Sequence, residues 1–187
     1  MPGLDDSRQF VPLKIAVLTV SDTRTPEDDK SGATLVERIT AAGHTVAARA
    51  IVVDDVAAIR SRVETWIADP EIDVVITTGG TGFTGRDVTP EAVEPLFEKR
   101  MEAFSSLFLL VSFQKIGTSA IQTRATAGVA RATYVFCLPG SPGACKDAWD
   151  NILVHQLDYR YRPCNFVEIM PRLDEHLRRP KSKGATA

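Results

Sequence analysis

The stretch from Asp73 to Ala92 reads DVVITTGGTGFTGRDVTPEA, and it joins a short apolar strand, a glycine-rich loop and the start of a helix. We expect Thr89 to cap that helix, while Pro90 suits its first turn. Glycines permit positive φ angles and let a ligand approach the backbone closely. The stretch therefore predicts a loop that holds an anion such as phosphate on its N–H groups, and a tight strand-to-helix turn is the alternative. The loop contains Gly79, Gly80, Thr81, Gly82 and Gly85.

The composition is that of one soluble domain. The chain has 187 residues, of which 44% are hydrophobic and 25% are charged. A net charge of −2 gives no basic footprint for nucleic acid, and no apolar run reaches the roughly 20 residues of a membrane span. The N-terminal MPGLDDSRQF carries acids where a signal peptide has a positive region. We therefore expect a cytoplasmic protein that binds neither nucleic acid nor membranes.

The cysteines and histidines do not form a recognisable site. Three cysteines without a C-x-x-C pair indicate neither a disulfide framework nor a zinc site. We interpret Cys137 and Cys145 as small buried fillers, because free cysteine is among the most buried residue types. Three scattered histidines are interpreted as surface or core residues rather than ligands or bases, namely His44, His155 and His176.

Working outward from the loop, apolar segments alternate with segments of helical spacing. Nearly continuous apolar runs predict strands over residues 14–20, 45–53 and 133–138, the last paired with a short strand at 126–130. Helical spacing predicts helices over residues 31–42, 56–68, 90–99, 101–113 and 142–154, with one further helical turn at 118–124. This alternation predicts an α/β fold with a mostly parallel sheet covered on both faces. Residues 1–13 are expected to form an arm, 14–170 the domain and 171–187 a disordered tail.

Parallel strands bring the loops that follow them to one edge of the sheet, where ligands bind. Three of these loops carry acids, two are glycine turns, and Arg86 adds positive potential. Such a mixture suits a phosphorylated ligand with Mg²⁺, because the metal needs carboxylate oxygens and the phosphates need N–H donors. For Asp54, capping of the next helix is an equal alternative. The loops expected to meet are Ser21–Asp22, Asp54–Asp55, Gly79–Asp87 and Gly140–Gly143.

Two other phosphate-binding patterns fit less well. Gly80-x-Gly82-x-x-Gly85 formally matches a dinucleotide fingerprint, but its strand is the third rather than the first. The helix also begins only near Thr89, and no acid stands about 20 residues further on. A nicotinamide-dependent oxidoreductase is therefore a distant alternative. A Walker A loop is excluded because no Lys-Ser/Thr follows the glycines.

Four motifs together resemble the MoaB/Mog family of molybdenum cofactor biosynthesis, with greater similarity to its MoaB members. They are TTGGTGFTGRDVTPEA at 77–92, TVSD at 19–22, LPGSPGA at 138–144 and RPCNF at 162–166, and the likeness covers roughly Leu13 to Phe166. The resemblance implies a molybdopterin-binding fold, a three-layer α/β/α sandwich. It also implies adenylyl transfer from Mg-ATP to the terminal phosphate of molybdopterin, which yields adenylylated molybdopterin and pyrophosphate.

Carried over by position, the resemblance implies catalytic and metal-binding roles for Asp54 and Asp87. Gly79, Gly80, Thr81 and Gly82 would line the ligand cleft, and neighbouring loops would contribute Ser21, Asp22, Gly140 and Ser141. It further implies cooperation with other molybdenum cofactor biosynthesis proteins and a homo-oligomer, either a trimer or a hexamer of two trimers. The N-terminal arm favours the hexamer.

The resemblance also leaves an alternative activity. Some MoaB-type members are degenerate at the two acids and bind molybdopterin without transferring adenylate, whereas this chain keeps both acids. However, it has Ala103-Phe104-Ser105-Ser106 and Leu109 where relatives carry Gly-Phe-Gly-Glu and then an arginine. This departure bears on pterin recognition or on a subunit contact. A non-catalytic molybdopterin-binding protein with weak nucleotide binding is therefore the second hypothesis.

Overall fold

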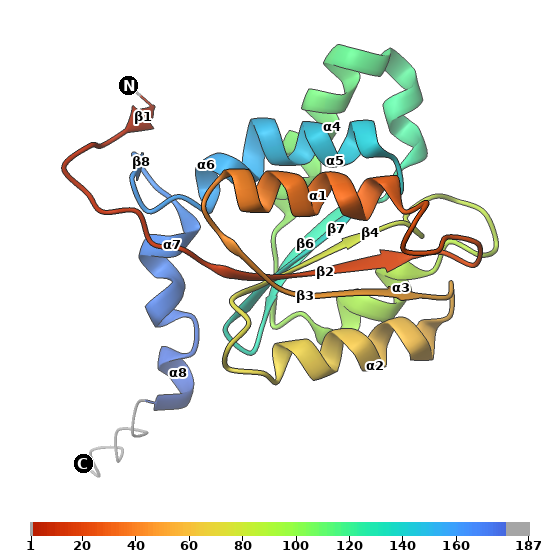
Figure 1. The fold of residues 1–187 in the computed structure, drawn as a ribbon, viewed down its shortest axis with the longest axis horizontal. Helices are drawn as coiled ribbons and strands as arrows, with labels where there is room; N and C mark the ends of the chain where they lie inside the picture. Colours follow the sequence, from red (N-terminus) through yellow and green to blue (C-terminus); the bar gives the residue numbers. More distant parts are fainter. Residues whose placement is uncertain (1, 179–187) are drawn as a thin grey trace, which may run out of the picture.

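A six-stranded mixed sheet forms the middle of the molecule (Figure 1). The computed structural model describes residues 2–178, without the side chains of residues 177 and 178. The strand order is β3 (Thr45–Val52), β2 (Lys14–Val20), β4 (Val74–Thr78), β7 (Thr133–Leu138), β6 (Thr126–Ala130) and β5 (Lys99–Arg100). The first four strands are parallel. Strand β6 pairs antiparallel with β7, and β5 pairs antiparallel with β6. Arg131 and Ala132 take positive φ angles of 48° and 68° in the tight turn between β6 and β7.

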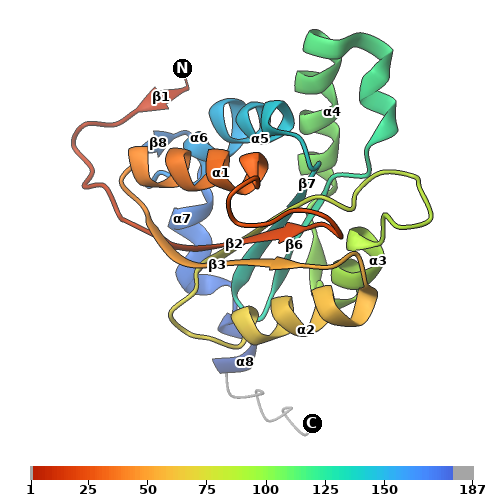
Figure 2. The same cartoon turned by 45° about the vertical axis from the view of Figure 1, so that its right-hand side comes forward.

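Helices cover both faces of the sheet and give the molecule three layers (Figure 2). One face packs against α1 (Lys30–Ala41), α4 (Glu102–Ile116) and α5 (Pro142–Ala148), and the other against α2 (Val56–Ile67) and α3 (Thr89–Val93). The apolar runs of β2, β4 and β7 are nearly continuous because both faces of these strands are buried. The predicted α/β/α sandwich with a mostly parallel sheet is confirmed.

The segment between α3 and β6 differs from the prediction of two helices. The first helix continues only through η1 (Glu94–Leu96), whereas the prediction extended it to about Lys99. Lys99 and Arg100 instead pair with Val129 and Gly128 of β6, so a distant strand decides their conformation. The second helix is longer than predicted, because α4 runs to Ile116 and is followed by the 3₁₀ helix η2 (Gly117–Gln122).

Among the described residues, Glu102–Gln122 is long and apolar enough to cross a membrane by length and composition. Its 21 residues include a window of mean hydropathy 1.3, so the expectation that no apolar run reaches this length is wrong. One such segment is weak evidence for a membrane protein, because a helix that packs in a domain passes the same test. Phe104 and Phe108 of α4 are buried, and the Phe104 ring lies 5.2 Å from that of Phe136 in β7.

The two ends of the described chain lie beside the domain. Within the predicted arm, β1 (Gly3–Leu4) pairs antiparallel with β8 (Tyr161–Arg162).

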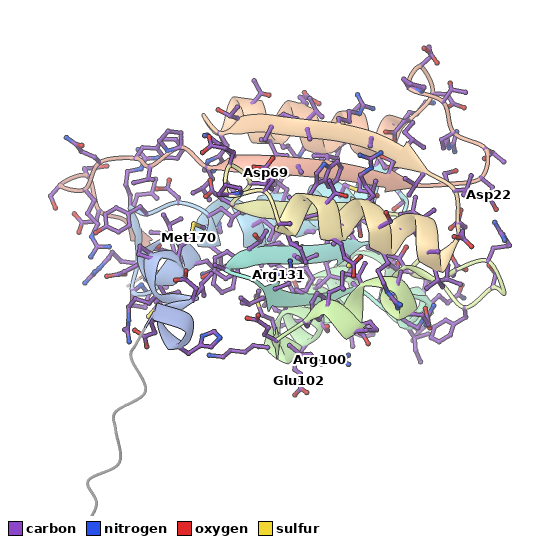
Figure 3. The ribbon with its side chains drawn as sticks, turned by 90° about the horizontal axis from the view of Figure 1, so that it is seen from below. Asp22, Asp69, Arg100, Glu102, Arg131 and Met170 are labelled. Atoms are coloured by element: carbon purple, nitrogen blue, oxygen red, sulfur yellow. The ribbon has the colours of Figure 1, made fainter. Side chains whose placement is uncertain are left out.

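After α5 the helix continues as the π-helical η3 (Trp149–Leu153) and as α6 (Val154–Gln156). The chain then forms α7 (Phe166–Ile169), η4 (Met170–Arg172) and α8 (Glu175–Arg178). Of the predicted tail, residues 179–187 lie outside the described residues. Asp22 and Asp69 mark opposite ends of the sheet in Figure 3.

Two of the three cysteines are buried, as the sequence predicts. Burial raises the pKa of the Cys137 thiol to about 12 and that of Cys145 to about 11. The Cys145 Sγ also lies 3.2 Å from the Thr78 Oγ1. Both thiols therefore stay protonated at neutral pH, which fits packing residues rather than nucleophiles. Cys164 is exposed.

His44 connects the arm to the domain and makes stability depend on pH. Its Nδ1 accepts a hydrogen bond from the Leu13 N–H at 3.1 Å, and its ring contacts those of Phe10 and Trp149. Burial lowers the pKa of His44 below its ordinary 6.5, although the charge of Asp158 opposes this shift. The unfolded chain therefore binds a proton first, so the neutral histidine stabilises the fold fully above 6.5 and less as the pH falls toward the lower folded pKa.

We expect the melting temperature to fall as the pH is lowered from 6.5, and His44→Gln to make this fall shallower. Differential scanning calorimetry across this range measures the slope. His155→Gln is the matched control, because His155 is exposed. Equal slopes for wild type and both variants would contradict the assignment to His44.

Candidate ligand and metal site

Four strand ends meet at one edge of the sheet, on the right of Figure 1. The strands β3, β2, β4 and β7 are neighbours and parallel, so their following loops share this edge. Hydrogen bonds join the loops directly. The Ser21 N–H donates to the Val52 carbonyl at 2.9 Å, and the Gly79 N–H donates to the Leu138 carbonyl at 3.0 Å. The expected gathering of Ser21, Asp22, Asp54 and the glycine turns is what the structure shows.

Packing within the loops requires glycine at several of these positions. Gly79 has a φ of 107°, and a Cβ there would collide with the Val20 carbonyl oxygen. Gly80 has a φ of 64°, and a Cβ there would collide with the Thr89 hydroxyl. A Cβ on Gly140 would lie 3.1 Å from the Gly79 Cα, so these two loops touch through their backbones. The glycines therefore have a structural reason, and the case for a ligand depends on the side chains around them.

Thr89 holds the loop instead of capping the helix. It is the first residue of α3, and its hydroxyl donates to the Gly79 carbonyl at 2.8 Å. Its N–H donates to the Gly80 carbonyl at 2.9 Å. Val88 occupies the cap position without a side-chain hydrogen bond, so the predicted cap is wrong. The Thr89 hydroxyl bonds to the distant Gly79 carbonyl rather than to the N–H groups of the helix end, which local sequence rules had favoured.

The two acids singled out by the sequence have different environments. Burial raises the pKa of Asp87, but hydrogen bonds from Thr84 and from the Gly82 N–H outweigh this effect and leave it below the ordinary value. The Asp87 Oδ2 accepts from the Thr84 N–H at 2.8 Å and from its hydroxyl at 2.6 Å. The pKa of Asp54 is raised by burial, by the charge of Asp22 and to a lesser extent by that of Asp87. A cation bound at Asp54 would offset the cost of burying its negative charge and would weaken its repulsion from Asp22 and Asp87.

Asp55, rather than Asp54, caps α2. The Asp55 carboxylate accepts from the Ala58 N–H at 2.8 Å. The Asp54 N–H donates to the Asp22 Oδ1 at 3.1 Å, which ties the loops after β3 and β2 together. A built Cβ on Gly80 would lie 3.1 Å from the Asp54 Oδ1, so this carboxylate reaches the glycine loop. The alternative of a capping role for Asp54 is thereby removed.

Arg86 and Asp22 neutralise each other. The guanidinium donates from Nε and Nη2 to the two Asp22 oxygens, each at 2.8 Å, and the Asp22 pKa is lowered mainly by this contact. The Arg86 side chain is 65% exposed, so a ligand phosphate can still compete for it. The positive charge expected from Arg86 is therefore partly neutralised by Asp22.

Two serines border the same edge. The Ser141 hydroxyl accepts from the Ala144 N–H at 3.1 Å and caps α5, as its sequence position predicts. The Ser21 hydroxyl accepts from the Thr23 and Arg24 N–H groups at 3.2 Å. A hydroxyl that accepts in this way can still donate its own proton to a ligand. Ser21, but not Ser141, lines a cavity of about 580 Å³ together with Asp22, Arg24, Arg49 and the end of β3.

Sequence reasoning missed two parts of this edge. Asp29 is buried, caps α1 and binds the Thr19 hydroxyl at 2.7 Å and Arg49 at 2.8 Å, which fixes the loop after β2. Arg124 reaches the Gly79–Asp87 loop from the start of β6 and hydrogen bonds to several of its carbonyls. Arg49 lies 20 positions from Asp29, and Gly82 lies 42 positions from Arg124, so neither contact leaves a local pattern in the sequence. Only the position of Asp29 before a helix was a local signal.

The acids present suit a magnesium ion carried in by a phosphate ligand. The described residues contain no group of three or more histidine, cysteine or acidic side chains placed to hold a metal alone. Magnesium in phosphate-transfer sites commonly uses one or two carboxylates and takes its remaining ligands from substrate phosphates and water. Asp54 and Asp87 are close enough to interact electrostatically, and two carboxylates of this kind are enough for such a magnesium ion.

Comparison with known proteins shows the family. Residues 16–159 match the family described as a probable molybdopterin binding domain. The chain is 51% identical over 160 residues to molybdenum cofactor biosynthesis protein B of Escherichia coli K12, covering 86% of this chain and 94% of that protein. A crystal structure of molybdenum cofactor biosynthesis protein B superposes with a TM-score of 0.81 at 37% identity, over 90% of this chain and 99% of that one.

A second solved structure extends the comparison. The molybdopterin biosynthesis enzyme MoaB of Thermus thermophilus superposes with a TM-score of 0.69 at 27% identity, over 90% of this chain and 98% of that one. The family match spans most of the chain, and the relatives are covered almost over their full length. The chain therefore belongs to the MoaB family of molybdenum cofactor biosynthesis proteins.

Proposed function

We propose that this protein is a molybdopterin adenylyltransferase, which uses Mg-ATP to adenylylate the terminal phosphate of molybdopterin. The observation that carries the proposal is the pair of acids at the turn where four strand ends meet, with Asp54 beside Gly80 and Asp87 beside Gly82. Membership of the family supports the pterin substrate, and the relative from Thermus thermophilus is called an enzyme. The chemistry of the site supports a phosphate ligand with a metal ion, and the nucleotide is what the resemblance of the four motifs implies.

The reaction balances without a base from the protein. A phosphate oxygen of molybdopterin attacks the α-phosphorus of ATP, the new P–O bond forms, and the bond to the departing pyrophosphate breaks. The attacking oxygen is already anionic, so no proton has to be removed. Catalysis then consists mainly of positioning and charge neutralisation, which oriented N–H donors provide. When bound, Mg²⁺ supplies neutralisation of phosphate charge, and Asp54 and Asp87 would hold it.

The remaining loop residues have positioning roles in this proposal. The Gly79 and Gly82 N–H groups donate to the Leu138 carbonyl and to the Asp87 carboxylate, so the N–H groups of Gly80 and Thr81 and the N-terminal end of α5 would face phosphates. Ser21 and Ser141 donate their hydroxyl protons, and Arg86 exchanges Asp22 for a phosphate oxygen. The cavity of about 580 Å³ lined by Ser21 and Asp22 is of the size that binds small ligands, and it adjoins the glycine loop through the Arg86–Asp22 contact without being lined by Asp54 or Asp87.

One observation favours a second candidate, a molybdopterin-binding protein without transferase activity. Ser105, Ser106 and Leu109, which depart from the family pattern, line a cavity of about 250 Å³ with Thr123 and Arg124. Arg124 also donates a hydrogen bond to the glycine loop. It therefore lies between the departing positions and the candidate site. A changed surface there bears on pterin binding or turnover.

Pyrophosphate release distinguishes the two candidates. We expect purified protein with ATP and Mg²⁺ to release pyrophosphate only when molybdopterin is added, and chelation with EDTA to stop the release. Molybdopterin binding is measured in parallel by quenching of the pterin fluorescence. Pterin binding without pyrophosphate release would favour the binding protein, and absence of both would contradict both candidates.

We also propose that the protein is a cytoplasmic homo-oligomer, with a hexamer favoured over a trimer, and that it works with other molybdenum cofactor biosynthesis proteins. The α4–η2 unit projects from the rest of the molecule in Figures 1 and 2. Several of its large apolar side chains are exposed. Contiguous exposed apolar surface of this kind commonly marks a protein interface. The exposed side chains are Leu107, Leu109, Leu110, Phe113, Ile116 and Ile121.

Light scattering on a sizing column tests the assembly. We expect wild type to elute with the mass of six chains or three, and Leu110→Glu to shift it to smaller species because a charge is costly to bury at an interface. Ile169→Glu is the matched control, since Ile169 is 46% exposed on α7 and Leu110 is 54% exposed on α4. A monomeric wild type would contradict the proposed assembly.

A further inference from the structure

Arg124 contacts the Gly79–Asp87 loop near both of its ends. Its backbone N–H donates to the Thr81 carbonyl at 2.8 Å. Its Nε donates to the Gly82 carbonyl, and its Nη2 donates to the Asp87 carbonyl, each also at 2.8 Å. Arg124 therefore connects the first part of the loop to its last residue, Asp87.

Two further contacts fix the guanidinium itself. Its Nη1 is paired with the carboxylate of Glu91, which lies in the first turn of α3. Its centre lies 5.6 Å from the centroid of the Phe83 ring. The neighbouring Thr123 hydroxyl lies 3.2 Å from that of Thr81. With 28% of its side chain exposed, Arg124 is held by the loop, by α3 and by an aromatic face.

These bonds bear directly on the Asp87 carboxylate. In a trans peptide the N–H points opposite to the preceding carbonyl, so fixing the Thr81 carbonyl also fixes the Gly82 N–H. That N–H is one of the donors that lower the pKa of Asp87. A built Cβ on Gly82 would lie 2.8 Å from the Asp87 Oδ2, which shows how closely the carboxylate rests on this peptide. Arg124 thus acts on Asp87 through the loop backbone.

The contacts require the shape of arginine as well as its charge. A guanidinium offers donors in a planar fork, and here Nε and Nη2 reach two carbonyls while Nη1 reaches a carboxylate. An ammonium group is a compact point charge and cannot span these acceptors in the same geometry. Lysine at this position would keep the charge and lose the clamp.

We propose that Arg124 is a positioning residue for the adenylyl transfer, holding the glycine loop so that the Asp87 carboxylate keeps its place in the site. This inference rests on the proposed function, and it adds a residue outside the loops that carry the motifs. It differs from a role in stability alone, because the bonds it makes end on the peptides that orient Asp87.

The test compares Arg124→Lys and Arg124→Ala with Arg38→Lys in steady-state transfer kinetics. Arg38 is a matched control, because it is 21% exposed and binds Asp150 through two nitrogens away from this site. We expect kcat to fall about 100-fold for Arg124→Ala and by less for Arg124→Lys, because small misplacement of reacting groups has effects of this size. The KM for ATP should change far less than kcat. Added ethylguanidine should restore part of the activity of Arg124→Ala.

A kcat for Arg124→Ala equal to that of Arg38→Lys would overturn the inference. So would a loss that ethylguanidine does not rescue and that tracks a lowered melting temperature. If wild type itself transfers no adenylate, the proposed function fails, and hydrogen exchange then tests the clamp alone. Faster exchange of the Gly82 and Thr84 amides in Arg124→Ala would support the clamp, and unchanged exchange would overturn it.

Discussion

Asp87→Asn is expected to abolish adenylyl transfer while leaving the fold intact. The substitution keeps the size of the side chain and an oxygen that can accept from the Thr84 N–H, but it removes the negative charge. Substitutions of groups that only support a metal ligand already reduce affinity or activity roughly 10- to 100-fold. We therefore expect a loss of more than about 100-fold for a residue proposed to hold the ion itself.

Steady-state rates at several Mg²⁺ concentrations provide the measurement, and Asp54→Asn is expected to behave similarly. Asp150→Asn is the control, because Asp150 binds Arg38 on the helical face away from the site. Melting temperatures show whether each variant is folded. Full activity of Asp87→Asn at low Mg²⁺ would contradict a metal-holding role for this acid.

Gly79→Ala is expected to have the largest effect on stability. An alanine would have to adopt a φ of 107°, which side chains strongly disfavour, and its Cβ would meet the Val20 carbonyl oxygen at the edge of the sheet. That oxygen belongs to the backbone of a buried strand and cannot move away as a flexible side chain would. We expect the free energy of unfolding to fall by about 3 kcal/mol or more, combining backbone strain with displacement of the loop.

Urea denaturation measures this change. Gly143→Ala is the matched control, because a Cβ at Gly143 meets nothing within 4 Å and the residue lies in α5. Alanine favours helix over glycine by up to about 1 kcal/mol, so this variant should be as stable as wild type or slightly more stable. Equal stability of Gly79→Ala and wild type would show that the loop is not packed as described.

Most of the fold could be predicted because its signals are local. The runs at 14–20 and 133–138 are apolar on both faces, as is typical of a covered parallel strand. Ser141 and Pro142 mark the start of α5 because a serine cap and a first-turn proline are also local signals. The exceptions depend on distant partners. Lys99 and Arg100 form a strand only because β6 lies beside them.

The candidate site was predictable in outline only. The parallel strands bring Ser21, Asp54 and the glycine loop to one edge, which the alternation of strands and helices in the sequence already implied. The choice between Asp54 and Asp55 as the helix cap had no sequence signal, and the structure assigns it to Asp55. Arg124 was missed because its acceptors are backbone carbonyls about 40 residues earlier, and such pairings leave no pattern in a single sequence.

Adenylyl transfer is tested most directly by mass spectrometry of the pterin after incubation of the purified protein with molybdopterin, ATP and Mg²⁺. We expect adenylylated molybdopterin from wild type and none from Asp87→Asn. Unmodified molybdopterin from a wild-type protein that still binds the pterin would contradict the proposed transfer.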